Sequence, residues 1–392
     1  MISVTEAKQL VNDHCKKLET IQVDLYNATG LVLAEDIYSQ TDSPPFDQSA
    51  MDGYAYKFSG ANTTKSLQIL HEIAAGDAPK NISTINSAVR IFTGAQVPNE
   101  FDTVVMQEKV EVIGDQLLIK DPDQKKGMNI RLKGSQIKKG ALALKNGTKI
   151  SPGAAGYLAS IGIASVKVIS RARVSIISTG NELISPGKDL QPGKVYECNT
   201  YSLNAALNEF EIKPQAIHKV VDKQIAIEEA VNNSLKSSDI IILSGGVSVG
   251  DHDHVAKALE ACGVKCIFHK VKQKPGKPLY FGIKGNTPVF GLPGNPAALL
   301  TCFYEYIAPA ILKIMGHSNT IDPKLSLSEP FTKKPGLTHF LKGKVNGNSV
   351  TILNAQESYI MSSFALADCI VQLDESRSTF EKGELVEVQL LK

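Results

Sequence analysis

The sequence predicts a multidomain α/β plus β protein, in which a mostly parallel three-layer α/β domain is joined to smaller β domains. Its 392 residues exceed the length of one ordinary domain. From about residue 171 to 317, apolar strand candidates alternate with helical patterns, which indicates a parallel sheet with helices on both faces. Before and after this region, short alternating segments separated by Gly, Pro and Asn indicate the strands of small β domains.

The first β-rich stretch is expected to interrupt another domain. Residues 1–47 open with a helix whose start is marked by a capping box of Ser3 and Glu6, and extended segments follow. Residues 48–134 predict a small barrel or sandwich. Residues 135–170 have the character of the first region, so we expect 1–47 and 135–170 to form one domain around an insertion. A small all-β domain is expected at 322–392.

The α/β region carries the most regular signals. The apolar run 240–243 suits a strand that is buried on both faces. The strand candidates are RVSIISTG, PQAIHKVV, DIIILSGG, CIFHKV and TPVFGLPG. The helix candidates are TYSLNAALNEF, QIAIEEAVNNSL, DHVAKALEAC and PAALLTCFYEYIAPAILKIM.

Composition disfavours several classes of protein. Lys and Arg total 42 against 40 Asp and Glu, so the net charge indicates neither nucleic-acid binding nor attraction to an anionic membrane. We find no run of eighteen apolar residues and no signal-peptide pattern at the N-terminus. The six scattered cysteines are typical of reduced thiols. These features together predict a cytoplasmic protein.

Glycine- and proline-rich turns follow several strands of the predicted sheet, where ligands of such sheets bind. Backbone N–H groups and helix N-termini at such turns can form an anion pocket, although each turn alone is explained by tight turning. A basic loop adds Lys270, Lys274 and Lys277. The turn residues are Thr179 to Glu182; Ser244, Gly245, Gly246 and Ser248; and Pro293, Gly294 and Pro296. The sequence therefore predicts binding of a phosphate-bearing or otherwise anionic small molecule.

Acidic residues near these turns have two interpretations. Asp251 and Asp253 can cap the helix that starts there, or one of them can bind a hard cation that bridges phosphates. Glu182 and Asp222 also follow strands and are candidates for the same cleft. Asp52 and Gly53 fit a type I′ hairpin turn. Walker and G-x-G-x-x-G patterns are missing, which disfavours ATP hydrolysis and hydride transfer.

Taken together, the motifs resemble one known family. They are FDQSAMDGYA (46–55), IFTGAQVP (91–98), VVMQEKV (104–110), NIRLKG (129–134), STGNEL (178–183), SGGVSVGDHD (244–253), KPGKP (274–278) and GLPGNP (291–296). In this order they are similar to the molybdopterin molybdenumtransferases, the bacterial MoeA family, whose eukaryotic relatives include the gephyrin E domain. The resemblance spans nearly the whole chain, including SYIMSSFALADCIVQL near its end.

The resemblance implies four domains: an elongated domain (1–47 plus 135–170), an inserted β domain (48–134), an α/β molybdopterin-binding domain (171–317) and a C-terminal β-barrel (322–392). It implies a homodimer with the site between the α/β domain of one subunit and the inserted domain of the other. It also implies insertion of molybdate into adenylylated molybdopterin, with Mg²⁺-dependent hydrolysis of the adenylate. A molybdopterin adenylyltransferase is then a possible partner.

Site residues are carried over by their motifs. The catalytic set implied is Asp52, Glu182, Asp222, Asp253, Lys270 and Lys274, with Asp253 and Glu182 also as metal ligands. The implied substrate-binding set is Thr93, Ser244, Gly245, Gly246, Ser248, Lys277, Pro293, Gly294 and Pro296.

One position departs from the family. Relatives commonly have Gly-Glu-Asp after the NIR segment, whereas this chain has Gly134, Ser135 and Gln136. Gln136 carries no negative charge, so metal affinity or activity can differ. An alternative is therefore a non-catalytic protein that binds molybdopterin or serves as a scaffold. A weaker alternative is an enzyme that adenylates the pterin instead of consuming the adenylate.

Overall fold

The computed structural model describes residues 1–59, 65–78, 82, 85–246, 254–318 and 323–391. The chain divides into two compact units, one made of Met1–Ile21 with Ile169–Lys392 and the other of Gln22–Val168. The first residues therefore group with the C-terminal part of the chain, whereas the sequence suggested a continuous segment 1–47. The finer boundaries of four domains stay a prediction.

The larger unit contains a six-stranded α/β sheet in the order β16-β13-β17-β21-β20-β18. Strands β16, β13, β17 and β21 are parallel, β20 runs antiparallel to them, and β18 is antiparallel to β20. Five of the six strands thus point the same way, as predicted. Their bounds are β13 Val174–Thr179, β16 Ala216–Val220, β17 Ile240–Ser244, β18 Lys265–His269, β20 Tyr280–Lys284 and β21 Thr287–Leu292.

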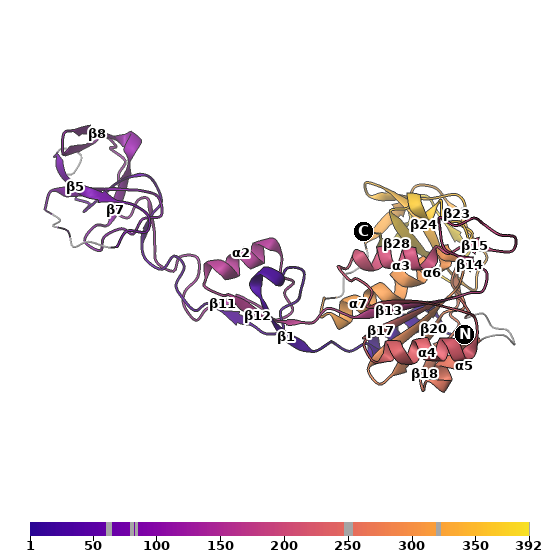
Figure 1. Cartoon of the computed structure of the whole chain (residues 1–392). Coiled ribbons are helices and arrows are strands. Elements are labelled where there is room, and N and C mark those ends of the chain that lie inside the picture. Colours follow the sequence, from indigo (N-terminus) through magenta and orange to yellow (C-terminus); the bar gives the residue numbers. More distant parts are fainter. Residues whose placement is uncertain (60–64, 79–81, 83–84, 247–253, 319–322, 392) are drawn as a thin grey trace. The chain divides into compact units, whose positions relative to one another are not determined.

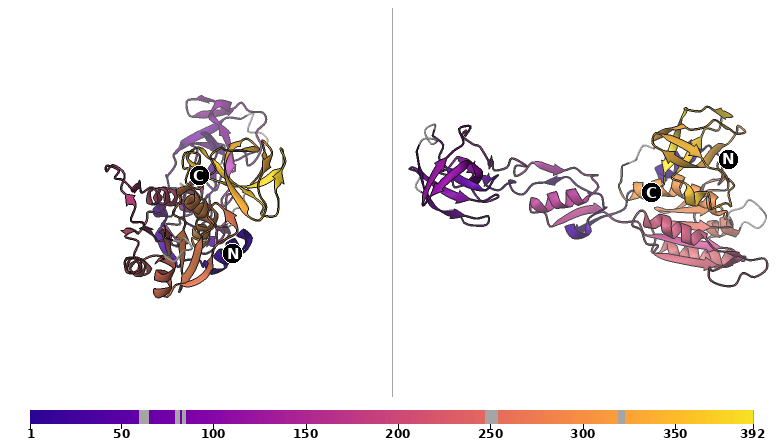
Figure 2. Two further views of the ribbon diagram at one scale, coloured as in Figure 1. Left: turned by 90° about the vertical axis from the view of Figure 1, so that its right-hand side faces the viewer. Right: turned by 90° about the horizontal axis from the view of Figure 1, so that it is seen from above.

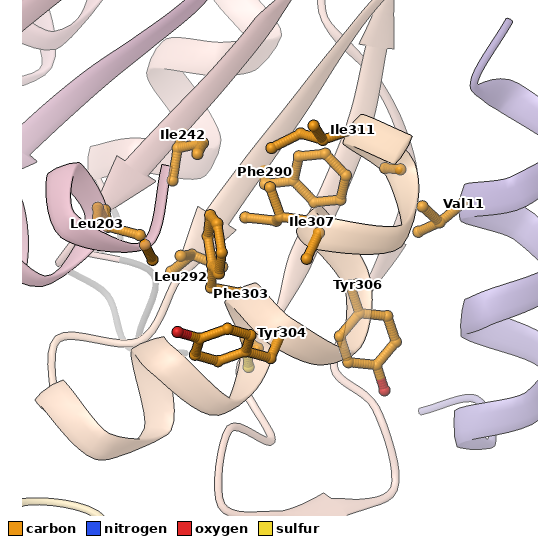
Figure 3. Packing of buried hydrophobic residues seen from close by; sticks show 14 of the residues in the cluster. Val11, Leu203, Ile242, Phe290, Leu292, Phe303, Tyr304, Tyr306, Ile307 and Ile311 are labelled. Atoms are coloured by element: carbon orange, nitrogen blue, oxygen red, sulfur yellow. The ribbon is translucent and has the colours of Figure 1, made fainter. Parts of the chain in front are cut away.

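Helices cover both faces of this sheet (Figure 1). Because side chains alternate along a strand, Ile240 and Ile242 enter one core while Ile241 and Leu243 enter the other. On the first face lie α1 (Val4–His14), α3 (Asn199–Asn208), α6 (Pro296–Cys302) and α7 (Ala308–Ile314); on the second lie α4 (Gln224–Leu235) and α5 (His254–Ala261). Figure 3 shows the first core, where Phe290 lies near Ile307 and Ile311 and Leu203 faces Leu292.

The helix that contains α6 and α7 is long and apolar. Judged by length and composition alone, Pro296–Ile314 could cross a membrane. However, 83% of its 18-residue apolar stretch is buried inside the protein. It is a core helix of the larger unit. Between α6 and α7 the chain forms a π-helical turn, η3 (Phe303–Ile307), just before Pro309. Proline has no N–H to donate, and a local widening of the helix is one way to accommodate it.

The C-terminal region closes into a five-stranded barrel, in which β24 and β26 join the ends of the run β24-β25-β22-β28-β26 (Figure 2, orange to yellow). Strand β19 (Gln273–Lys274), from the α/β part, adds in parallel to β24. A short pair, β23 (Phe331–Thr332) and β27 (Thr379–Phe380), lies outside the barrel order. The barrel strands are β22 Lys324–Leu327, β24 Thr338–Asn346, β25 Ser349–Ile352, β26 Cys369–Leu373 and β28 Leu385–Leu390. The prediction of a multidomain α/β plus β protein is confirmed.

The smaller unit has its own six-stranded sheet, in the order β7-β4-β6-β5-β9-β8. These strands are β4 Gly53–Tyr56, β5 Leu67–Ile73, β6 Ser87–Ile91, β7 Thr103–Met106, β8 Val110–Ile113 and β9 Gln116–Ile119. The remainder of the unit has helix α2 (Pro152–Ser160) and short strand pairs. The pairs are β1 (Thr20–Asp24) with β12 (Ser165–Ile169), β2 (Ile37–Tyr38) with β11 (Leu142–Leu144), and β3 (Gln48–Ser49) with β10 (Ile130–Arg131).

Candidate functional site

The candidate turns gather at one edge of the α/β sheet, which we call the site edge. Strands β13, β16, β17 and β21 are parallel, so the turns after them open on this same edge. Strand β18 runs in the same direction, so the loop after it, residues 270–277 (the lysine loop), leaves from the same edge. Topology therefore brings the turn residues of the larger unit and its three candidate lysines to one side of the sheet.

A buried asparagine joins two of these turns. Asn199, at the start of α3, donates hydrogen bonds from Nδ2 to Ser244 Oγ (2.9 Å) and to the Gly294 carbonyl (2.9 Å). The Gly245 N–H also donates to the Leu292 carbonyl at 3.3 Å. The turns after β17 and β21 are thus held side by side. Sequence reasoning missed Asn199, because an asparagine at a helix start is equally typical of an ordinary cap.

Two oxygen atoms beside Gly246 at the site edge have no hydrogen-bond partner among the described residues. Thr179 Oγ1 and Asp222 Oδ1 are both buried, and a Cβ built on Gly246 would lie 3.1 Å and 3.6 Å from them. Gly246 has φ +69° and Gly245 has φ +90°, so both need the freedom of glycine. Buried acceptors without partners are costly. The surroundings of Gly246 therefore suit a ligand that brings a cation or hydrogen-bond donors.

The lysine loop is held from the core. Gln273 is 1% exposed, and its Nε2 donates to the Gly276 carbonyl at 3.1 Å while its Oε1 accepts from the Tyr306 hydroxyl. A Cβ on Gly276 would lie 2.5 Å from Cys302 Sγ, so the loop packs directly on the long core helix. Lys274 and Lys277 are exposed and Lys270 is half-buried. The loop thus presents positive charge from a rigid support.

One expectation about anion binding is wrong. The turn 291–296 precedes α6, and the sequence suggested that the N–H groups of such a helix start were open to a ligand. Instead, the N–H groups of Ala297 and Ala298 donate to the Ser358 carbonyl at 3.0 and 3.3 Å. These donors are used within the protein. Of the predicted residues in this turn, Pro293 is buried, Gly294 is exposed and Pro296 is half-buried.

The acidic candidates are only partly placed. Glu182 is exposed on the turn after β13, and the N–H of Asp222 donates to Asn181 Oδ1 at 3.2 Å, which links the turns after β13 and β16. Asp253, Asp251 and Ser248 lie outside the described residues. Within the described part of the chain, no three His, Cys, Asp or Glu side chains are grouped so that they could hold a metal ion.

Asp52 and Thr93 lie together in the smaller unit. Asp52 Oδ1 accepts hydrogen bonds from the Thr93 N–H and Oγ1, both at 2.8 Å, and these bonds lower the pKa of the Asp52 carboxyl. The predicted hairpin at Asp52 and Gly53 is wrong, because β3 pairs with β10 whereas β4 pairs with β6 and β7. The Asp side chain instead ties the start of β4 to the turn after β6.

Gln136 is also in the smaller unit. It is exposed, and its N–H donates to the Ser43 carbonyl at 2.9 Å. A carboxylate, Asp42, contacts residues on both sides of Gln136 in the sequence. It accepts a hydrogen bond from the Lys139 N–H at 2.8 Å and forms an ion pair with Lys133 at 3.5 Å. The hydrogen bond from Lys139 is the main cause of the lowered pKa of Asp42. Asp42 is therefore bound to the segment 133–139, which contains Gln136.

Three family models match consecutive parts of the chain. They are the MoeA N-terminal region (domain I and II) over residues 2–162, a probable molybdopterin binding domain over 175–313, and the MoeA C-terminal region (domain IV) over 324–391.

Curated relatives and solved structures agree with these matches. The chain is 34% identical to a molybdopterin molybdenumtransferase of Haemophilus influenzae over 95% of this chain and 94% of that protein. It is also 34% identical to one of Nostoc sp., over 98% of this chain and 87% of that protein. A crystal structure of a Pyrococcus molybdopterin biosynthesis MoeA protein is similar with a TM-score of 0.84 and 30% identity, covering 100% of this chain and 99% of that one. The chain therefore belongs to the MoeA family, whose curated members bear the name molybdopterin molybdenumtransferase.

Proposed function

We propose that this chain inserts molybdate into adenylylated molybdopterin and hydrolyses the adenylate, which releases AMP. Its relatives carry the name of this activity. The observation that supports it most in the chain itself is the convergence at the site edge of the Gly245 and Gly246 turn, the 291–296 turn and the lysine loop. The proposal assigns the substrate to this edge.

The lysines supply the binding of negative charge. Molybdate and the diphosphate of the adenylate are both multiply anionic, and charge-assisted hydrogen bonds are the strong ones in such sites. We assign Lys270 and Lys274 to the reacting oxyanions and Lys277 to substrate binding. Because the loop is fixed by buried Gln273, these charges need little reorganisation when the substrate binds.

A divalent cation such as Mg²⁺ fits the acceptors of the site edge. Mg²⁺ is usually bound by one or two carboxylates together with substrate phosphates, and Asp222 Oδ1 is a buried carboxylate oxygen without a partner among the described residues. Asp222, Glu182 and Asp253 would hold it. When bound, such an ion polarises phosphoryl oxygens.

The protein contributes to the reaction rate mainly by placing the two substrates beside each other. Ser244, Gly245 and Gly246 are fixed beside Gly294 through Asn199, and they would hold the pterin side of the substrate. Molybdate oxygens held by the lysines would then lie beside the two dithiolene sulfurs. Fixing two reactants in this way converts an encounter in solution into a reaction within one complex, which is a large source of rate enhancement.

The remaining assignments concern the assembly and location of the protein. We infer a homodimer in which Asp52 and Thr93 of the inserted domain complete the site of a second subunit. We also infer the four domains given by the motifs, a cytoplasmic location, and delivery of the adenylate by a molybdopterin adenylyltransferase. Asp52 is held as a carboxylate by Thr93, which suits a fixed polar contact to substrate.

The proposal is tested by AMP release. The purified chain is incubated with adenylylated molybdopterin, molybdate and Mg²⁺, and AMP is quantified over time. We expect AMP release that requires molybdate, with one molybdenum bound to the pterin per AMP. Omission of Mg²⁺ is expected to slow it.

The second candidate is a non-catalytic molybdopterin-binding or scaffolding protein, which the neutral Gln136 favours. It predicts that the same mixture forms a stable protein–pterin complex without releasing AMP. A Gln136→Asp variant separates the two further: if only the variant releases AMP, the natural chain is a binding protein.

A further inference from the structure

A segment of the C-terminal barrel region caps the start of α6. The Ser358 carbonyl accepts from the Ala297 and Ala298 N–H groups, and Asn295 Nδ2 donates to Ser358 Oγ at 2.9 Å. Asn295 itself makes no side-chain cap at this helix. The turn 291–296 is therefore fixed at its helix end by Ser358, which lies 63 positions after Asn295 in the sequence.

The capping segment is folded around one buried lysine. Lys342, on β24, is 5% exposed, and its Nζ donates to the carbonyls of Ala355 (2.8 Å), Ile360 (3.2 Å) and Glu357 (3.4 Å). An ammonium group has three N–H donors, and each finds one carbonyl here. Ser358 lies between these three anchored residues.

Gln356 also attaches the capping segment to β24, through the backbone of Lys342. Its Oε1 accepts from the Lys342 N–H at 2.9 Å, and its Nε2 donates to the Lys342 carbonyl at 2.9 Å. The segment 355–360 is thus attached to β24 by both the side chain and the backbone of Lys342.

The three hydrogen bonds from the ammonium group of Lys342 go to backbone carbonyls, and the charge of Glu357 lies near enough to raise its pKa. Burial is the larger effect and lowers the pKa of Lys342, as expected for a charged group removed from water. Lys344, two residues further along β24, is half-exposed and pairs with Asp368 at 2.9 Å. The two lysines of this strand therefore differ in role. Lys344 forms an exposed ion pair, whereas Lys342 holds the segment 355–360 in place.

We propose that Lys342 is a positioning residue for the reaction. By holding segment 355–360 it keeps Ser358 over the start of α6, and so sets the position of Gly294 and Pro296 in the site. This inference rests on the proposed function for its effect on catalysis, but the capping itself does not depend on that function.

The direct test is amide hydrogen exchange of the full-length protein without substrate. In Lys342→Met, exchange of the Ala297 and Ala298 amides should be at least ten-fold faster than in the wild type. Lys344→Met, from the same strand, should leave both amides unchanged, and Lys342→Arg should restore most of the protection. Unchanged exchange at these amides in Lys342→Met would overturn the proposal.

Kinetics separate positioning from a loss of stability. In the AMP-release assay, Lys342→Met should raise KM for adenylylated molybdopterin at least ten-fold while kcat changes less. A role confined to stability would lower the active fraction and leave KM as it was, which would contradict positioning. If the wild type releases no AMP, the proposed function fails, while the exchange data still decide the capping. If Lys342→Met does not fold, Gln356→Ala provides the milder test, with the same two amides expected to exchange faster.

Discussion

At the scale of the residue, Gly53 allows the close strand packing that positions the Asp52 side chain. Strand β4 lies between β6 and β7, and a Cβ added to Gly53 would lie 1.9 Å from the Val105 carbonyl oxygen on β7. No side chain fits there without moving the backbone. The close approach of β4 and β7 therefore positions the Asp52 carboxylate, which then accepts both hydrogen bonds from Thr93.

Substitution of this glycine should consequently destabilise the smaller unit. We expect Gly53→Ala to lower the free energy of unfolding by about 1–3 kcal/mol, the usual cost of forcing an extra group into a packed site. Gly156→Ala is the control, because Gly156 lies inside α2 with open space around its Cβ position. Alanine there should be neutral or stabilising. Thermal or chemical unfolding of both variants measures this, and equal stability of Gly53→Ala and the wild type would refute the steric account.

Residues of the site differ in how far sequence could predict them. Gly245 and Gly246 were predictable, because glycine-rich turns after buried strands signal positive φ angles. Asn199 and Gln273 were not, because Asn199 bonds to Ser244 and Gly294, and Gln273 accepts from Tyr306. These partners are far away in sequence and become apparent only when the sheet is assembled. Sequence therefore indicates the residues that face a ligand better than the residues that hold them in place.

At the scale of the element, β19 joins the lysine loop to the barrel. Lys274 of β19 is paired with His339 of β24. Burial lowers the pKa of His339 to about 4, and the charges of Lys333 and Lys274 contribute to the same effect. The imidazole is therefore neutral in the folded protein at neutral pH.

This histidine predicts a dependence of stability on pH. Above about pH 6.5, His339 is neutral in both the folded and the unfolded state, so it does not make the free energy of unfolding depend on pH. As pH falls from about 6.5 towards 4, only the unfolded state binds the proton, so the free energy of unfolding falls. His339→Asn should flatten this part of the stability curve, whereas Thr338→Ser, the neighbouring change on β24, should not. Parallel curves for His339→Asn and the wild type from pH 7 to 4.5 would argue against a buried neutral imidazole.

Two elements of the larger unit escaped prediction for physical reasons. Strand β20 is interrupted by Gly282, which weakens a strand signal, yet a Cβ there would lie 2.7 Å from Val264 Cγ1, so glycine is needed for packing. The apolar run before Met315 predicted one regular helix. Its π-helical turn depends on how the chain accommodates Pro309, which hydrophobic periodicity does not report.

At the scale of the whole molecule, the candidate residues divide between the two units. The Gly-rich turns and the lysine loop belong to the larger unit, and Asp52, Thr93 and Gln136 belong to the smaller one. Parallel strand order made the first group predictable as one cluster, because the carboxyl ends of parallel strands meet at one edge. The second group was assigned by resemblance alone, since no local pattern links it to the sheet.

The central claim is that the lysine loop at the site edge binds the reacting anions, and one pair of variants tests it most directly. Lys274 follows β18 at the site edge, whereas Lys265 starts the same strand at the opposite edge and is also exposed. Removal of a charge-assisted contact costs about 1.5–3 kcal/mol. In AMP-release kinetics with adenylylated molybdopterin and molybdate, Lys274→Ala should therefore lower kcat/KM by roughly ten- to one-hundred-fold, and Lys265→Ala should keep the wild-type value. A folded Lys274→Ala that is as active as the wild type, or an equal loss in both variants, would contradict the account.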